Sequence, residues 1–373
     1  MARPKVLILQ RASSSIVYQT VQCLAAAGTF EVHYLTSYPK SPIRFSRFLR
    51  SVHYLEPCED DLSQLKQLKG FLREHPMDVL LTINEEEIDF IIRNADEELR
   101  SMVRLPEMPS EEMFRIASSK VFLASFMEEH NIPHPRSVSV ELSDPAGLNA
   151  VKDLRFPVII KPEKGWGGVG MIVFESHSRL VDHLKRHPMT QPRLLVQEFL
   201  TGSDHGCAVY CEKGKVLYST VQEKIPVEPY LFGASKAVVF RKDPEVEDIA
   251  RQLMEALTWN GIAQIDVFED QERGGYYVLE INPRYWGTLY GSLRSGLNFP
   301  EIICRKAMGL EATPMKYRPK KFVKIHGYLH ILKARLTGKK LKVDFNYSDS
   351  NIPEMLSDPL YAMVDLFGRL KRN

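Results

Sequence analysis

The stretch IDVFEDQERGGYYVLEINPR, residues 265–284, reads as two strands joined by a tight turn. Both strands are rich in β-branched and aromatic residues, and the glycines between them are typical of a hairpin. A turn centred near Arg273 sets Asp266 directly opposite Glu280. Because side chains alternate along a strand, Asn282 shares the face of Glu280. We therefore expect three polar groups on one face of this hairpin.

Two opposed carboxylates repel each other unless a positive charge lies between them. Two carboxylates and one amide oxygen are hard ligands that suit Mg²⁺, which takes its remaining ligands from water and substrate phosphates. Asp266, Glu280 and Asn282 are thus the predicted metal ligands. Pro283 directs the chain after them, and Arg284 places a permanent positive charge beside the carboxylates. The alternative is an amphipathic hairpin whose polar face is only solvated.

A second polar constellation lies in PVIIKPEKGWGGVGMIVF, residues 157–174. A strand ends at Lys161, a loop follows, and a strand returns. The loop contains four glycines: Gly165, Gly167, Gly168 and Gly170. Such a loop lets backbone N–H groups approach phosphates closely, although no GK[ST] opens a helix after it as in a Walker A loop. The alternative is a plain flexible turn.

Length and composition narrow the class of protein. A chain of 373 residues is long enough for two or three domains. Its 49 Lys+Arg against 47 Asp+Glu leave a formal charge of +2, which argues against a nucleic-acid binder. No apolar run reaches the length of a membrane span, and the N-terminus enters a strand directly, so we expect a cytoplasmic protein with reduced cysteines.

The order of elements predicts four regions. Residues 1–108 alternate strands and helices as in an open parallel α/β sheet, without a GxGxxG fingerprint. Residues 109–202 begin with two short helices and continue as a small antiparallel α+β lid. Residues 203–310 contain the helix of DPEVEDIARQLMEALTWNG and the hairpin described above. Residues 311–373 are a basic helical extension. The fold class is therefore mixed, α/β followed by α+β.

The motifs have the order found in a known superfamily. Lys161 with its glycine loop, VQEFLTGSD at 196–204 and the hairpin together resemble the ATP-grasp superfamily, over roughly residues 109–305. The region before them resembles the preATP-grasp domain. PVEPYLFGASKAV (226–238) and EINPRYWGTLYGSLRSGLNFP (280–300) are most similar to the carbamoyl-phosphate-synthase-like group of carboxylate-amine ligases.

The resemblance implies a nucleotide site. Lys120 and Lys161 would reach the phosphates of ATP, and the loop of Gly165, Gly167, Gly168 and Gly170 would fold over the triphosphate. The segment linking the two halves of the fold would contact adenine through the backbone of Glu198 and Leu200; its members are Gln197, Glu198, Phe199 and Leu200. Asp204 occupies the position of an acidic residue that contacts the ribose hydroxyls.

The resemblance also implies the metal and catalytic residues. Asp266, Glu280 and Asn282 match the ligands of two Mg²⁺ ions, for which Mn²⁺ can substitute, with Glu280 bridging them. Arg284 matches the arginine that steadies the transferred phosphoryl group. A basic residue of segment 222–242 would lie near the γ-phosphate, and both Lys236 and Arg241 are candidates. Lys236 is preferred because it follows a glycine-led loop.

These roles imply an ATP-dependent ligase that joins a carboxylate to an amine through an acyl phosphate and releases ADP and phosphate. The alternatives are a carbamoyl-phosphate-type phosphotransferase and a non-catalytic nucleotide-binding module. Segments 14–20, 85–88 and 285–297 are expected to line the pocket of a small-molecule substrate, such as an amino acid or a cell-envelope precursor. In it, Tyr285, Trp286 and Arg294 either recognise the substrate or only pack. Dimerisation is common in the superfamily.

The C-terminal extension has its own pattern. Residues 316–342 contain ten Lys or Arg and no Asp or Glu. Their apolar residues recur at helical spacing and predict a basic amphipathic helix: Phe322, Ile325, Leu329, Leu332 and Leu336. The favoured interpretation is docking on the catalytic domain with a solvated basic face. Peripheral contact with the inner face of an anionic membrane and attraction of a negatively charged substrate remain open.

Overall fold

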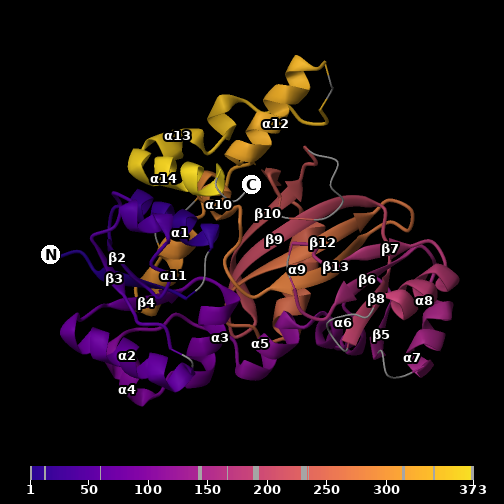
Figure 1. Cartoon of the computed structure of the whole chain (residues 1–373), viewed down its shortest axis with the longest axis horizontal. Helices are drawn as coiled ribbons and strands as arrows, with labels where there is room; N and C mark the ends of the chain where they lie inside the picture. The colour runs from indigo at the N-terminus through magenta and orange to yellow at the C-terminus, as the bar shows by residue number, and fades with distance from the viewer. Residues whose placement is uncertain are drawn as a thin grey trace.

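Three sheets organise the chain. The structure is a computed structural model that describes residues 2–11, 14–58, 60–141, 145–165, 167–187, 193–227, 233, 235–312, 316–338 and 341–370. Its sheets contain four, six and four strands. In Figure 1 the first sheet lies at the left, the six-stranded sheet in the centre and the remaining sheet at the right.

The first sheet is parallel, with strand order β3-β2-β1-β4. Its strands are β1 (Lys5–Gln10), β2 (Glu31–Thr36), β3 (Ser51–Tyr54) and β4 (Val79–Thr82). The helices around it are α1 (Ser15–Ala27), α2 (Asp61–Glu74), α3 (Glu85–Asn94) and α4 (Glu97–Met102). Val6 and Ile8 pack with α1 on one face, whereas Leu7 and Leu9 pack with α2 and α3 on the other. The predicted α/β sheet, covered on both faces, is confirmed.

The central sheet is antiparallel, with order β13-β12-β9-β10-β11-β14. Its strands are β9 (Gly202–Glu212), β10 (Lys215–Lys224), β11 (Ala237–Arg241), β12 (Gly261–Asp270), β13 (Tyr276–Asn282) and β14 (Lys320–Val323). Helix α9 (Pro244–Ala256) covers one face, where Leu253 and Met254 pack against Val209, Val221 and Ile265. The side chain of Asp243 caps α9 by accepting from the Val246 N–H, as its sequence predicts. The other face carries Asp266 and, elsewhere on the sheet, buried apolar residues such as Ala208, Tyr210 and Phe240.

The third sheet is small and antiparallel, with order β5-β8-β6-β7. Its strands are β5 (Ser137–Glu141), β6 (Val158–Pro162), β7 (Ile172–Phe174) and β8 (Arg193–Glu198), and its helices are α7 (Pro145–Ala150) and α8 (His177–Arg186). The two short helices predicted before it are α5 (Glu111–Ser118) and α6 (Lys120–Glu129). Strand β5 is an addition to the predicted elements.

In its described residues the C-terminal extension combines one strand, a short 3-10 helix (Tyr347–Asp349) and three α-helices: α12 (Ile325–Leu336), α13 (Ile352–Leu356) and α14 (Pro359–Leu370). It follows α10 (Leu289–Arg294) and α11 (Phe299–Ala307). The predicted long amphipathic helix is wrong at its start, because Phe322 belongs to β14, which pairs with β11. Helix α12 also docks through the face of Tyr328 and Ile331, so Leu329 and Leu336 point outward. The extension forms the top of the molecule in Figure 1.

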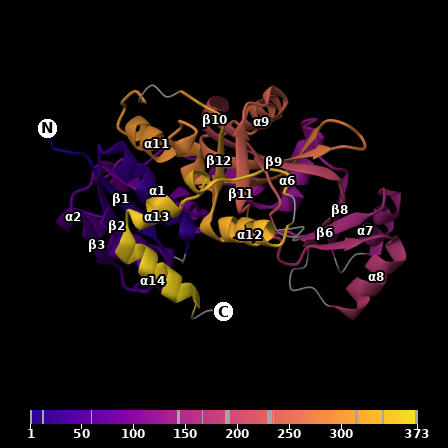
Figure 2. The same cartoon turned by 90° about the horizontal axis from the view of Figure 1, so that it is seen from above.

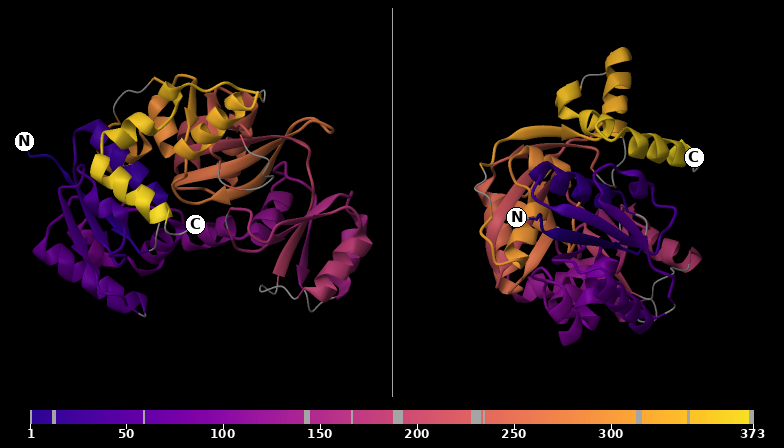
Figure 3. Two further views of the ribbon diagram at one scale, coloured as in Figure 1. Left: turned by 45° about the horizontal axis from the view of Figure 1, so that its top comes forward. Right: turned by 90° about the vertical axis from the view of Figure 1, so that its left-hand side faces the viewer.

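The C-terminal end of the chain packs on the N-terminal sheet domain. Asp358 is buried and accepts hydrogen bonds from the Ser46 hydroxyl, from the Tyr18 hydroxyl at 3.3 Å and from the Arg47 N–H at 3.1 Å. The rings of Tyr18 and Tyr361 stack. Figure 3 shows α14 lying against the indigo N-terminal elements. No helix in the described part of the chain is long and apolar enough to span a membrane.

Replacing Asp358 by alanine is expected to lower the free energy of unfolding by about 2–4 kcal/mol, because three donors lose a buried acceptor. Urea denaturation measures this loss, and trypsin should then cleave the extension first. Asp344→Ala is the control, since Asp344 is mostly exposed and its ion pair with Arg335 lies at the surface. An equal loss in both variants would contradict an anchoring role for Asp358.

Candidate active site

The hairpin carries its polar residues in the predicted register. Asp266 pairs with Glu280, and Gln264 pairs with Asn282. A bulge follows at once, because the next residue, Val267, pairs with Val278. Bulges occur often beside functional sites, where they redirect side chains. The prediction that Asp266 and Glu280 lie opposite each other on one face is confirmed.

Lys224 is a site residue that the sequence analysis missed. Its Nζ lies 2.9 Å from Asp204 Oδ1 and 3.2 Å from Asp266 Oδ1, so one ammonium joins carboxylates of β9 and β12. Burial alone would lower the pKa of Lys224, but Asp266 and Asp204 raise it above the ordinary value. Burial raises the pKa of Asp266 to about 7, although Lys224 opposes this shift. A signal existed: Lys224 lies in the segment where a basic residue was expected.

Glu280 lies among lysines. Lys120 Nζ is 3.4 Å from Glu280 Oε2 and donates a hydrogen bond to the Gly165 carbonyl at 2.9 Å. Burial would raise the pKa of Glu280, but Lys120, Lys161 and Lys224 together hold it below the ordinary value. Lys120 therefore connects the metal-ligand candidate with the glycine loop.

Lys161 is buried beside strand β8. Its Nζ donates to Gln197 Oε1 at 2.6 Å, and Gln197 Nε2 in turn donates to the Ser137 hydroxyl at 2.9 Å. Burial lowers the pKa of Lys161 to about 8, against the opposing effect of Glu280. The amide of Gln197 thus orients the ammonium of Lys161.

The glycine loop adopts a backbone that other residues rarely take. Its four glycines all have positive φ, between 66° and 143°: Gly165, Gly167, Gly168 and Gly170. A Cβ on Gly170 would lie 2.8 Å from Pro162 Cγ, so this position also lacks space for a side chain. The loop lies against Lys120, whose N–H donates to the Glu163 carbonyl at 3.1 Å. Trp166, within the loop, lies outside the described residues.

Residues 197–200 run between two sheets, since β8 ends at Glu198 and β9 begins at Gly202. The carboxylate of Glu198 accepts from the Arg155 N–H at 2.8 Å and forms an ion pair with Arg273 at 2.7 Å. The Phe199 N–H donates to the Pro157 carbonyl. The side chain of Glu198 is thus occupied by structural contacts, and the expected contacts of Glu198 and Leu200 with adenine involve only their backbone.

Arg284 joins the hairpin to the first sheet domain. Its Nη2 donates to Asn282 Oδ1 and its Nη1 to the Tyr285 carbonyl, both at 2.8 Å. Its Nε lies 3.3 Å from Glu85 Oε1, at the start of α3. Burial raises the pKa of Glu85, although Arg284 opposes this. Segment 85–88, expected beside the substrate, therefore contributes Glu85 to the charged groups around Arg284.

One of the two candidates for the γ-phosphate, Arg241, lies across the sheet from Lys224. Val238 pairs with Lys224 and shares its face, so Arg241, three residues later, faces the opposite side. There its guanidinium lies 3.1 Å from both Glu223 and Asp243. The placement contradicts Arg241 as a candidate, because a strand residue cannot reach through its own sheet. Lys236, two residues before Val238, stays a prediction.

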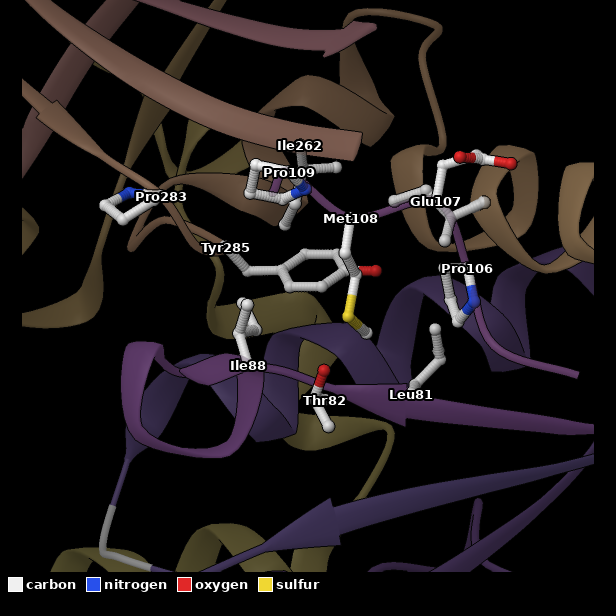
Figure 4. Close-up of a pocket in the computed structure, with 11 residues that line it drawn as sticks. Leu81, Thr82, Ile88, Pro106, Glu107, Met108, Pro109, Ile262, Pro283 and Tyr285 are labelled. Atoms are coloured by element: carbon white, nitrogen blue, oxygen red, sulfur yellow. The ribbon is translucent and has the colours of Figure 1, made fainter. Parts of the chain in front are cut away.

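The three residues considered for substrate recognition are engaged in contacts within the protein. Tyr285 and Trp286 are buried in the core with stacked rings, which favours packing. Arg294 forms an ion pair with Glu354 and donates to the Ser348 carbonyl at 2.9 Å, so it holds the C-terminal extension. Figure 4 shows Tyr285 beside Met108 in a cavity of about 30 Å³. That cavity is too small for a metabolite.

The donor set of the hairpin suits a divalent cation. Asp266 and Glu280 are opposed carboxylates, and the Asn282 amide lies beside them. Its Nδ2 is 3.4 Å from Asp266 Oδ2 while its Oδ1 accepts from Arg284, so a rotation of this amide would offer its oxygen to a cation. Mg²⁺ prefers such hard oxygen ligands. Within the described ranges, no group of three or more His, Cys, Asp or Glu side chains is arranged to hold a metal ion. The candidate set consequently depends on the amide and on ligands from a substrate.

Comparisons with known proteins identify relatives by sequence. The family model described as an ATP-grasp domain matches residues 117–288. A D-alanine–D-alanine ligase of Acetivibrio thermocellus is 29% identical over 165 residues, which make up 40% of this chain and 44% of that enzyme. The match thus spans less than half the length of this curated relative.

Solved structures share the fold at low sequence identity. An L-amino acid ligase from Bacillus licheniformis has a TM-score of 0.62 at 16% identity, and the match covers 83% of this chain and 76% of the ligase chain. An N5-carboxyaminoimidazole synthetase from Staphylococcus aureus, complexed with ADP, has a TM-score of 0.67 at 15% identity, with coverage of 90% and 87%. The mixed fold of parallel and antiparallel sheets is therefore one that these proteins have in common.

Proposed function

We propose that this chain, whose residues 117–288 form an ATP-grasp domain, is an ATP-dependent ligase that joins a carboxylate to an amine. The observation that carries the proposal is the gathering of Lys120, Lys161 and Lys224 around Asp266 and Glu280. Cations that converge on a pair of metal-ligand carboxylates suit a nucleoside triphosphate with its metal. The division of the chain at residues 108, 202 and 310 is part of this proposal.

In the proposed complex, Lys120 and Lys161 bind the phosphates and the glycine loop closes over them. Backbone groups of Glu198 and Leu200 contact adenine, and Asp204 contacts the ribose. Lys224 lies between Asp204 and Asp266, so we add it to the residues that face the phosphates. Lys236, in the loop before β11, remains the candidate for a contact with the γ-phosphate.

Asp266, Glu280 and Asn282 would hold Mg²⁺, which, when bound, neutralises charge on the phosphates. The protein supplies position and charge, and no side chain has to act as a nucleophile. A carboxylate oxygen of the substrate attacks the γ-phosphorus, and ADP leaves. The amine then attacks the carbonyl of the resulting acyl phosphate, loses a proton and displaces phosphate. Arg284 donates to the developing oxyanion.

The relatives suggest which substrates to test first. The curated relative is a D-alanine–D-alanine ligase, and one structural neighbour is an L-amino acid ligase. Amino acids are therefore the first candidates for both the carboxylate and the amine. A cytoplasmic reaction, where ATP is available, is part of this proposal.

The proposal is tested by trapping with hydroxylamine. Protein, ATP and Mg²⁺ are incubated with a panel of amino acids and other metabolite carboxylates, and hydroxamates, ADP and AMP are read by mass spectrometry. We expect one hydroxamate together with ADP, which identifies the carboxylate. AMP would mean adenylation and would overturn the acyl-phosphate route. Transfer of phosphate without a hydroxamate would favour a phosphotransferase.

The binding of ATP without metal is expected to depend on pH through Lys161. Its pKa of about 8 in the folded protein lies below the lysine value of an unfolded chain. Folding thus disfavours the charged form, so this residue destabilises the fold below about pH 8. That cost disappears as pH rises toward the unfolded lysine pKa, while the charge that binds phosphate is lost. In EDTA, calorimetry should show about tenfold weaker ATP binding at about pH 9 than at about pH 7.

The Lys161→Met variant should bind ATP weakly and lose this pH dependence, whereas Lys120→Met should keep it. An equal decrease with pH in wild type and Lys161→Met would assign the titration to another group.

A further inference from the structure

Helix α12 presents apolar side chains to solvent. Leu329, Leu332 and Leu336 are 54%, 37% and 89% exposed. Their spacing of three and four residues puts them on one face of the helix. The opposite face is buried against the protein through Tyr328 and Ile331. The leucines, which we call the α12 stripe, are therefore not what attaches this helix to the fold.

Helix α14 repeats the arrangement. Leu360, Met363 and Phe367 are 49%, 50% and 58% exposed and lie three and four residues apart. We call them the α14 stripe. The buried face contains Tyr361, which stacks on Tyr18 of the first sheet domain. Both terminal helices are thus fixed by one face and expose a second apolar face.

Exposed apolar side chains are concentrated in this extension. Of the thirteen large apolar side chains that are exposed among the described residues, nine lie between positions 329 and 367. Patches of this kind on soluble domains mark surfaces that contact a partner or a membrane. In Figure 2, viewed from above, α12, α13 and α14 lie on the near side, and no other element covers them.

The charge of the extension limits what can cover it. Residues 316–342 carry ten Lys or Arg and no Asp or Glu, whereas the whole chain has a formal charge of only +2. Two of these cations, Arg335 and Lys342, form ion pairs with Asp344 and Glu223. A second copy docked through the same surface would place two strongly basic segments together. The partner is therefore anionic, and it must also accept leucine and phenylalanine side chains.

We propose that the C-terminal extension docks on an anionic lipid surface. The α12 and α14 stripes would enter the boundary between headgroups and acyl chains, while the basic residues of segment 316–342 contact the headgroups. Such a surface matches both properties, whereas a nucleic acid would match only the charge. This inference does not rest on the proposed ligase function, because none of its residues belongs to the candidate site.

The test is sedimentation of the full-length protein with sucrose-loaded vesicles. One set is pure phosphatidylcholine and the other contains about 30% phosphatidylglycerol, since anionic lipid attracts basic segments. We expect pelleting with the anionic set only. About 0.5 M NaCl should weaken it, because salt screens the headgroup contacts. The double variant Leu329→Gln/Leu336→Gln should bind at least about tenfold more weakly.

A matched control is Leu62→Gln, which changes a leucine that is 72% exposed on α2 and lies outside the extension. It should pellet like wild type. Equal binding by the control and the double variant would overturn the role of the α12 stripe, as would the absence of wild-type pelleting. A wild-type dimer that the double variant converts to monomer, seen in analytical ultracentrifugation without vesicle binding, would replace the lipid surface by a second copy.

Discussion

Replacing Glu280 by glutamine is expected to lower ATP-dependent product formation by about a thousandfold or more. The amide keeps the shape of the side chain but removes the charge that faces Asp266 and Lys120. A proposed carboxylate ligand of Mg²⁺ is lost, and three lysines lose the anion that they share. The measurement is the rate of ADP release with the trapped substrate, at saturating ATP and Mg²⁺.

The control is Glu269→Gln, on the strand next to Glu280. Glu269 is 40% exposed and contacts Ser203 and His205, away from the cluster. It should keep its rate within about threefold, since surface changes have small effects. Circular dichroism and thermal melting check that both variants are folded. An unaltered rate in Glu280→Gln would remove the central claim that this hairpin holds the metal.

Replacing Lys224 by methionine is expected to lower both stability and turnover. Methionine keeps the volume but leaves Asp204 and Asp266 without the ammonium that joins them. Because Asp204 is 40% exposed, the loss of stability should lie between the values for surface and buried pairs, at about 1–3 kcal/mol, and loss of the proposed phosphate contact should lower turnover by about a hundredfold. Urea denaturation and ADP release measure the two effects.

The loss of stability in Lys224→Met should shrink as pH falls. The pKa of Asp266 is about 7 in the folded protein, above that of an unfolded aspartate, so protonation below pH 7 favours the fold and removes the repulsion. We expect a larger loss at about pH 8 than at about pH 5.5. A loss that does not change with pH would mean that packing, and not charge, explains the variant.

Arg241→Met is the matched control on the opposite face. It breaks the ion pairs with Glu223 and Asp243 by removing a guanidinium that is 37% exposed, so we expect a loss of about 1 kcal/mol and a rate within about threefold of wild type. A decrease in turnover like that of Lys224→Met would contradict the assignment of Arg241 to the far side of the sheet.

The features that depend on neighbouring residues could be predicted from the amino-acid sequence alone. The register of Asp266 with Glu280 follows from strand alternation and the position of one turn, and the start of α9 follows from Asp243 and Pro244. The parallel sheet was equally predictable, because strands buried on both faces are continuous apolar runs. The register of the hairpin and the start of α9 each depend on about 20 consecutive residues or fewer.

The contacts between side chains far apart in the sequence could not be predicted, because they depend on long-range strand pairing and domain packing. Lys224 reaches Asp204 and Asp266 because β9 pairs with both β10 and β12, and Glu85 reaches Arg284 because the first sheet domain packs beside the hairpin. Long-range strand pairing also explains which face of α12 points outward. Pairing of β14 with β11 fixes where the helix begins, and so which of its two apolar faces, that of Tyr328 or that of Leu329, contacts the protein. A periodic pattern specifies that a helix has an apolar face, whereas long-range strand pairing selects the face that is buried.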